Sequence, residues 1–491
     1  MQRSFLFNLI KNMQMSEKRY FSIYANRHSA KTENKNLRLF QIIDELGEDD
    51  NAEIIKQLKK EKINTNFLSS DKNYLFNSIL KSLNEYHNSK TNSLIIKDLI
   101  ISIEILFYKG LFNESLKIIK YAEKLAKDIG HLVLILEILT WKKRCIGYAA
   151  GIERAYEVNQ EIAFHTDLLS NFKEITLLYY DGYMLKLRNE SKSKEVIQKD
   201  HRVILNHPLM KDEAQAKSFI SKLYWYLIFI DYYFLLSDKD KEYEYLTKLI
   251  RHMESNSYYA SENPLDYVSV YSRLFNNPVH KQSKKFFNSL NHLRQFPFKS
   301  QLSFSKDMIS QRIFIITNIA ELEWHIHFQK FAELEPKLEG ITKELKTIIT
   351  FIEPYYLIHF NYLLSLCLFS LGKSSMALDY VNYVLNHFKA DSRPVFFSKI
   401  EVLNILLHVD LGNDSLAGNL IAKLKRKKQD SIHPVEMKLL QAIDSEMKSK
   451  RKNKSPLREF VEETPTDLLK SDDTLVCIFT WAQRHVGLSE G

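Results

Sequence analysis

The stretch LGKSSMAL at residues 371–378 joins two apolar helical segments through a glycine. A small residue, Ala377, follows five positions after Gly372, and the same spacing leads from Gly412 to an alanine and from Gly110 to a serine. Glycine tolerates the left-handed conformation that ends a helix, and a small residue lets the returning helix pack closely. Gly372 and Gly412 are 40 positions apart, a period typical of stacked helical hairpins. The sequence therefore predicts a chain of helix pairs.

Composition independently favours an all-helical fold. The 491 residues include 12 glycines and 10 prolines, well under half of the roughly 12% that average usage gives, so helix breakers and tight turns are scarce. Apolar residues make up 45% of the chain, enough to bury a continuous core. We therefore predict an all-α fold, a right-handed α-solenoid of about eight helical hairpins with an N-terminal helical cap.

The repeat period divides the chain into three predicted regions. Residues 1–90 form an N-terminal helical cap region, residues 91–430 form the helical repeats, and residues 431–491 form a C-terminal helix and a charged tail. Within the repeats, helices are expected around the turns at Gly110 and at 149–151. The later helix pairs are expected at 173–205 with a turn at 189–191, at 212–254 with a turn at 237–240, at 265–294, and from a long helix through Trp324 to a return over 331–352.

At these positions the chain resembles the tetratricopeptide-repeat superfamily. In that family a small residue follows the glycine turn by five positions, and another small or apolar residue follows seven positions later. The corresponding pairs here are Ala377 and Val384, Ser115 and Ala122, and Ala417 and Leu424. The spacing of about 40 residues departs from the 34 of the family. The sequence as a whole, including 15–21 and 71–83, is similar to a group of uncharacterised Bacteroidetes proteins of this type, and the resemblance implies a binding scaffold without naming its partner.

The net charge of the chain does not require a nucleic-acid partner, and we expect none. The formal net charge is +9, from 69 basic and 60 acidic residues, which is a modest excess for a chain of this size. The densest basic stretches are 423–428 and 448–454. Such clusters can bind phosphates or acidic partners, and they equally suit the C-terminal end of a solvated helix.

Cysteine usage and hydropathy predict a cytoplasmic protein without a membrane span. Cys145, Cys367 and Cys477 are odd in number and widely separated, which is typical of reduced, buried thiols. The most apolar stretch, Leu223–Leu236, is shorter than the roughly 20 residues that cross a bilayer, and Asp231 lies in its middle. We expect it to form a buried helix.

No motif in the chain indicates catalysis, a cofactor or a metal site. Gly372-Lys373-Ser374 copies the end of a phosphate-binding loop, but Cys367 stands where the first glycine would be. The segment ELEWHIH at 321–327 contains two Glu-His pairs at the i, i+4 spacing that metal ligands use. Residues two apart on a helix are separated by about 200°, so the two pairs point to nearly opposite sides. Hydrogen-bonded histidines are the simpler interpretation.

The predicted function is therefore binding of a protein or peptide on the concave face of the repeats. Aromatic residues are concentrated on the predicted first helices of neighbouring pairs, and tyrosine is a common anchor at interfaces. The candidate partner-binding residues are Tyr180, Tyr183, Tyr226 and Tyr233. The alternative is that most of these rings fill the core between long helices. The sequence indicates neither the identity of the partner nor the oligomeric state.

A second hypothesis is a transcriptional regulator in which the repeats act as a sensor or dimerisation arm. Residues 34–88 predict three short helices, at 37–46, 52–58 and 74–86, as in a helix-turn-helix. The third helix region carries Lys72, Asn73, Asn77 and Lys81. The region also contains six acidic residues between 44 and 53, which would repel phosphates. A helical cap that covers the first repeat explains the same pattern.

Overall fold

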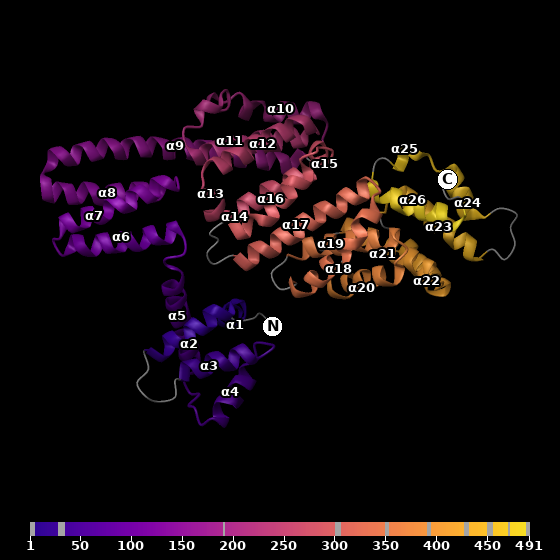
Figure 1. Cartoon of the computed structure of the whole chain (residues 1–491), viewed down its shortest axis with the longest axis horizontal. Coiled ribbons are helices and arrows are strands. Elements are labelled where there is room, and N and C mark those ends of the chain that lie inside the picture. Colours follow the sequence, from indigo (N-terminus) through magenta and orange to yellow (C-terminus); the bar gives the residue numbers. More distant parts are fainter. Residues whose placement is uncertain are drawn as a thin grey trace. The chain divides into compact units, whose positions relative to one another are not determined.

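The computed structural model describes residues 5–27, 35–189, 192–299, 306–348, 353–389, 394–426, 432–448, 455–469 and 472–487. Throughout these residues the regular structure is helical and contains no strand, which confirms the predicted all-α class (Figure 1). The chain divides into two compact units. Unit 1 combines Met1–Leu177 with Pro208–Lys222, and unit 2 combines Leu178–His207 with Leu223–Gly491.

Unit 1 begins with five helices that share one apolar core, in which Phe21, Leu39, Ile54 and Ile79 are fully buried. The three helices predicted within 34–88 are present as the last three of the five, and the Asp50 carboxylate caps the fourth helix by accepting from the amides of Ala52 and Glu53. The helices are α1 (Phe5–Asn12), α2 (Met15–Arg27), α3 (Lys35–Glu45), α4 (Asn51–Lys60) and α5 (Leu68–His87).

A separate apolar cluster in unit 1 holds the first predicted hairpin. Helices α6 (Asn92–Tyr108), α7 (Phe112–Asp128) and α8 (Leu132–Ala150) pack on one another in sequence order. Between α6 and α7, Gly110 has a φ of 75°, as predicted for a left-handed cap. Ser115 is fully buried and its hydroxyl donates to the Ile103 carbonyl at 3.2 Å, so the small residue lies where the two helices meet.

The next helix differs from the expectation. We predicted one helix after Gly151 and another from about residue 173, but α9 (Ile152–Asn189) is a single helix of 38 residues. No glycine or proline occurs between Ile152 and Asp181 to end it. The turn expected at 189–191 lies partly outside the described residues, and α10 (Lys194–Leu205) follows it. The chain then returns to unit 1 through two short 3₁₀ helices, and the Asn171 side chain fixes this return by donating to the Gln215 carbonyl at 2.8 Å.

In unit 2 the apolar stretch Leu223–Leu236 lies mostly within α11 (Phe219–Leu235), which is a largely buried helix as predicted. The turn expected at 237–240 is also present, because Ser237 has a φ of 54° and Asp238 caps the following helix. The subsequent helices are α12 (Lys239–Ser255), α13 (Tyr259–Glu262), α14 (Pro264–Asn276), α15 (Pro278–Lys281) and α16 (Phe286–Lys299).

The C-terminal part of unit 2 consists of hairpins whose first helices adjoin one another. Each of α17 (Lys306–His327), α19 (Pro354–Ser370) and α21 (Pro394–Asp410) contacts the next, and each packs on its own partner. The partners are α18 (Phe331–Ile348), α20 (Ser374–His387) and α22 (Asp414–Arg426). The region 431–491, predicted as one helix and a tail, contains further helices in its described part: α23 (Pro434–Lys448), α24 (Pro456–Glu463), α25 (Thr466–Leu469) and α26 (Asp473–His485).

The two glycine turns that predicted the fold have the expected geometry. Gly372 and Gly412 have φ values of 72° and 74°, and the amide after Gly372 donates back to the Leu368 carbonyl at 2.8 Å. This bond is the one that closes a helix in a Schellman motif. Ala377 and Ala417 are fully buried where the returning helices pack.

We expect Gly372→Ala to lower the free energy of unfolding by about 1 kcal/mol, because an L-residue is strained at positive φ. A Cβ at Gly372 would meet no atom within 4 Å, so the loss would come from the backbone alone. Gly418, inside α22, also has open space around its Cβ position and has no positive φ. Gly418→Ala is the matched control and should leave stability unchanged or raise it. Urea unfolding of both variants makes the comparison, and equal midpoints would contradict the strained cap.

Candidate functional site

Two of the four predicted partner-binding tyrosines lie on an exposed face of α9. Tyr180 is 56% exposed and Tyr183 is 39% exposed. Met184 and Leu187, at 49% and 57%, continue the same face at helical spacing. Between them and the interior lies Tyr179, whose ring packs against that of Tyr224 on α11 with centroids 5.3 Å apart. We call Tyr180, Tyr183, Met184 and Leu187 the α9 stripe.

The other two predicted tyrosines lie on α11 and face α12. Tyr226 is only 5% exposed, and its ring packs against those of Tyr245 and His252. Tyr233 is partly buried, and its ring stacks on that of Tyr245 with centroids 5.5 Å apart. The Lys241 ammonium lies over the Tyr233 ring, 5.0 Å from its centroid. The structure therefore does not bring the four tyrosines onto one surface. Tyr226 fills the core, which is the alternative that the sequence had left open.

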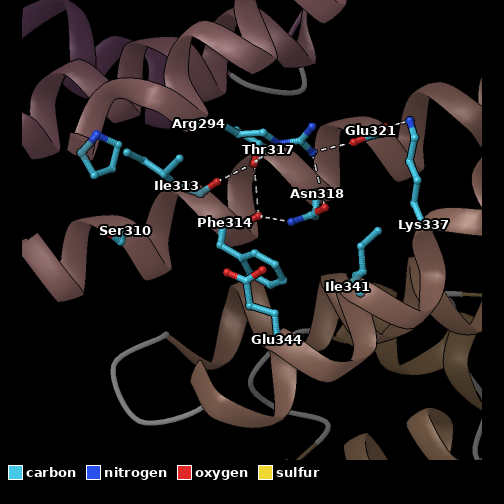
Figure 2. Close-up of a pocket in the computed structure, with 12 residues that line it drawn as sticks. Arg294, Ser310, Ile313, Phe314, Thr317, Asn318, Glu321, Lys337, Ile341 and Glu344 are labelled. Carbon is cyan, nitrogen blue, oxygen red and sulfur yellow. Dashed lines mark hydrogen bonds and ion pairs between the residues drawn. The ribbon is translucent and has the colours of Figure 1, made fainter. Parts of the chain in front are cut away.

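A cleft of about 430 Å³ lies between α16, α17 and α18 (Figure 2). Ile313, Phe314 and Ile341 form its apolar part. At one end the guanidinium of Arg294 and the ammonium of Lys337 converge on the carboxylate of Glu321. The cleft thus combines an apolar wall with a charged end built from three different helices.

The charged end is organised around a buried carboxylate. Glu321 is 2% exposed, and Arg294 donates to its Oε2 at 2.5 Å while Lys337 binds its Oε1. Arg294 also donates to the hydroxyl of Thr317 at 3.2 Å and to the amide oxygen of Asn318 at 3.4 Å. Burial by itself raises the pKa of Glu321, but the bonds and charges of Lys337 and Arg294 outweigh burial and lower the pKa. Glu321 therefore stays ionised and fully paired.

This arrangement is suited to holding charge. The Arg294 and Lys337 cations face the buried Glu321 carboxylate, and Glu344 adds a second carboxylate to the lining of the cleft. At the other end, away from Arg294 in Figure 2, burial raises the pKa of Glu344. Behind Glu321, the buried His325 donates from Nδ1 to the Lys330 carbonyl at 2.8 Å, so its ring carries a proton on Nδ1. Burial lowers the pKa of His325, which favours the neutral form.

The second Glu-His pair of α17 faces the other way, as the 200° separation predicts. Glu323 accepts from Lys281 at 2.7 Å and lies 3.5 Å from His359, while His327 Nδ1 lies 2.8 Å from the Asp473 carboxylate. These residues line a second cleft, of about 440 Å³. Within the described ranges, no group of three or more His, Cys, Asp or Glu side chains is placed to hold a metal ion.

Sequence reasoning missed the cations of the first cleft. Glu321 was noticed because of its spacing from His325, whereas Arg294 and Lys337 come from α16 and α18 and form no motif with it. The signal available in the sequence was a glutamate within the mostly apolar stretch 313–322, because a carboxylate that is buried with such residues requires cationic partners.

Hydropathy and the comparisons with known proteins assign no further property to the chain. Among the helices that the structure describes, none is long and apolar enough to cross a bilayer. No family model, no curated protein and no solved structure matches this sequence.

Proposed function

We propose that this protein is a scaffold that binds a protein or peptide partner and has no catalytic activity of its own. The observation that carries the proposal is the α9 stripe, in which four large apolar side chains are exposed on one helix face. Exposed apolar patches of this kind mark interaction sites because their burial is favourable by about 25 cal/mol per Å². Tyr180 and Tyr183 are the anchors in this proposal, and Met184 and Leu187 extend the contact.

The proposal includes a tetratricopeptide-like architecture, a right-handed solenoid of about eight hairpins. Its support is local: α6 contacts α8, α17 contacts α19, and α19 contacts α21, so the first helices of neighbouring hairpins adjoin one another. The three regions 1–90, 91–430 and 431–491 belong to the same proposal. A cytoplasmic location is supported by Cys145, Cys367 and Cys477, which are buried free thiols typical of a reducing compartment.

The alternative of a DNA-binding region at 34–88 has weaker support. The Lys72 ammonium bonds to Asn51 at the beginning of α4, whereas Lys59 and Lys60 lie at the end of that helix. At 1.5 Å per residue these ends are about 12 Å apart, so the lysines do not gather at one end of α4. Burial also lowers the pKa of Lys72. We therefore favour the scaffold over the regulator.

The test is affinity purification of the full chain from its native cell, with Tyr180→Ala compared with the natural protein. If Tyr180 anchors a partner, its loss costs on the order of 2 kcal/mol of affinity, or about 30-fold in Kd. Tyr355→Ala is the matched control, because Tyr355 is a tyrosine of similar exposure, 43%, on α19. A co-purifying chain should be lost with Tyr180→Ala and kept with Tyr355→Ala. Retention of every co-purifying chain by Tyr180→Ala would overturn the proposal.

A further inference from the structure

The C-terminal helix α26 lies against the first helices of three successive hairpins in unit 2. It packs directly on α17 and α19 and also on α24 and α25, and side chains at its two ends bond to α21. Helix α26 therefore lies along the row formed by α17, α19 and α21, in the position that a bound helical ligand would take.

The beginning of α26 is held by carboxylates. Asp472 caps the helix by accepting from the amide of Thr474 at 3.0 Å, and its other oxygen binds the ammonium of Lys399 on α21. The adjacent Asp473 bonds to His327 at the end of α17 at 2.8 Å. The Lys399 ammonium and the His327 imidazole, from two different hairpins, thus bond to the acidic beginning of α26.

The other end of α26 is held by an aromatic and a basic residue. The indole of Trp481 donates to the Asp410 carboxylate at the end of α21 at 3.0 Å, and its ring packs on Phe369 of α19. Arg484 donates to the Ser370 carbonyl at the end of α19 at 3.0 Å. At its beginning α26 bonds to Lys399 within α21, and near its end it bonds to Asp410 and Ser370, the last residues of α21 and α19. Helix α26 therefore runs parallel to α19 and α21.

Between these anchors α26 packs on the apolar side chains of α19 within one continuous core. Every residue of α19 from Phe360 to Phe369 is buried, so this helix is covered on all sides. Its neighbours α17, α20 and α21 account for part of that cover, and α26 supplies more with its buried face. The buried apolar residues of α26 are Leu475, Cys477, Ile478, Phe479, Trp481 and Ala482.

The packing of α26 leaves gaps at both ends. A cleft of about 490 Å³ is lined by Trp481 and Arg484 together with Phe369, and the cleft of about 440 Å³ is lined by Asp472 and Thr474. The second cleft is also lined by Tyr362, which is 2% exposed and whose hydroxyl interacts with the Thr474 side chain of α26. Protein interiors are normally close-packed. The two clefts beside α26 therefore leave part of the groove unfilled.

We propose that the face of α17, α19 and α21 is a helix-binding groove that α26 occupies in cis. Its external partner is an amphipathic helix that repeats the contacts of α26. A carboxylate in its first turn bonds to Lys399 and His327, and an indole or phenol about two turns later donates to Asp410. A basic residue at its end donates to the Ser370 carbonyl. Such a helix binds by displacing α26. The groove is distinct from the α9 stripe, so either surface can fail its test without the other.

The first measurement is hydrogen exchange on the intact natural chain. A helix that leaves its groove exposes its amides without unfolding the rest of the unit. We expect the amides of α26 to exchange at least tenfold faster than those in the middle of α19. Equal exchange rates for the two helices would show that α26 is a permanent part of the core and would overturn the proposal.

The second measurement uses a fluorescein-labelled peptide of residues 472–487 as the probe. Full-length chain carrying Asp472→Asn and Trp481→Ala has a weakened α26 and an unaltered groove, so it should bind the natural peptide at least tenfold more tightly than the unsubstituted chain does. The same peptide with its own Trp481→Ala change is the matched control and should bind weakly. No gain in binding by the doubly substituted chain, or loss of its helical circular dichroism, would assign α26 a purely structural role.

Discussion

Replacing Arg294 by leucine should destabilise unit 2 by about 3 kcal/mol, since it leaves the buried Glu321 carboxylate with one cation fewer. Arg294 supplies bonds to Glu321, Thr317 and Asn318, all of which are at most 5% exposed. The Lys337 side chain is 49% exposed and makes a single bond to Glu321, so Lys337→Leu should cost less. Urea unfolding followed by circular dichroism measures both variants.

Protonation of Glu321 gives this prediction a pH dependence of defined sign. Because the folded-state pKa of Glu321 is lowered, the carboxylate contributes stability above its unfolded pKa, and this contribution is lost as the pH falls through the folded pKa. In Arg294→Leu much of that contribution is already absent, so the variant should lose less stability on acidification than the natural protein. Glu321→Gln combined with Arg294→Leu removes the uncompensated charge and should recover part of the loss. Equal stability of Arg294→Leu and the natural protein would show that Lys337 alone neutralises Glu321.

Local signals predicted the parts of the fold that local physics determines. Gly110, Gly372 and Gly412 end helices because of their own backbone freedom, so their positive φ values followed from spacing alone. The small residues five positions later are buried for a similarly local reason, since the returning helix must pass close to the first. The same reasoning failed at α9, because a repeat period was used to place a break where no glycine or proline supplies one.

Long-range contacts explain what the sequence could not predict. The return of 208–222 to unit 1 depends on Asn171, which is more than 40 residues away along the chain. The docking of α26 depends on Lys399 and Asp410, which form no motif with it. Where a helix is apolar on several faces, as α11 is, periodicity does not reveal which face meets a neighbouring helix and which meets solvent. The four candidate tyrosines were divided between core and surface for this reason.

That division gives the prediction with the largest expected effect, Tyr226→Ala. Truncating a buried aromatic ring removes its burial free energy and leaves a cavity, and the usual cost is about 3–5 kcal/mol. Tyr226 is 5% exposed, and it packs against Trp225, Tyr245 and His252, so its surroundings cannot readily close over the gap. We expect a large fall in the urea midpoint and in Tm.

Tyr180→Ala is the matched comparison, because the same chemical change is made at a site that is 56% exposed. Its ring contacts that of Tyr179 and is more than half exposed, so stability should change by less than about 0.5 kcal/mol. If binding to a co-purifying partner is then measured, the two variants should behave in opposite ways: Tyr180→Ala loses affinity while it stays folded, and Tyr226→Ala loses stability. A folded Tyr226→Ala with unchanged Tm would place Tyr226 outside the core. A strongly destabilised Tyr180→Ala would mean that the α9 stripe packs inside the protein and is not a free surface.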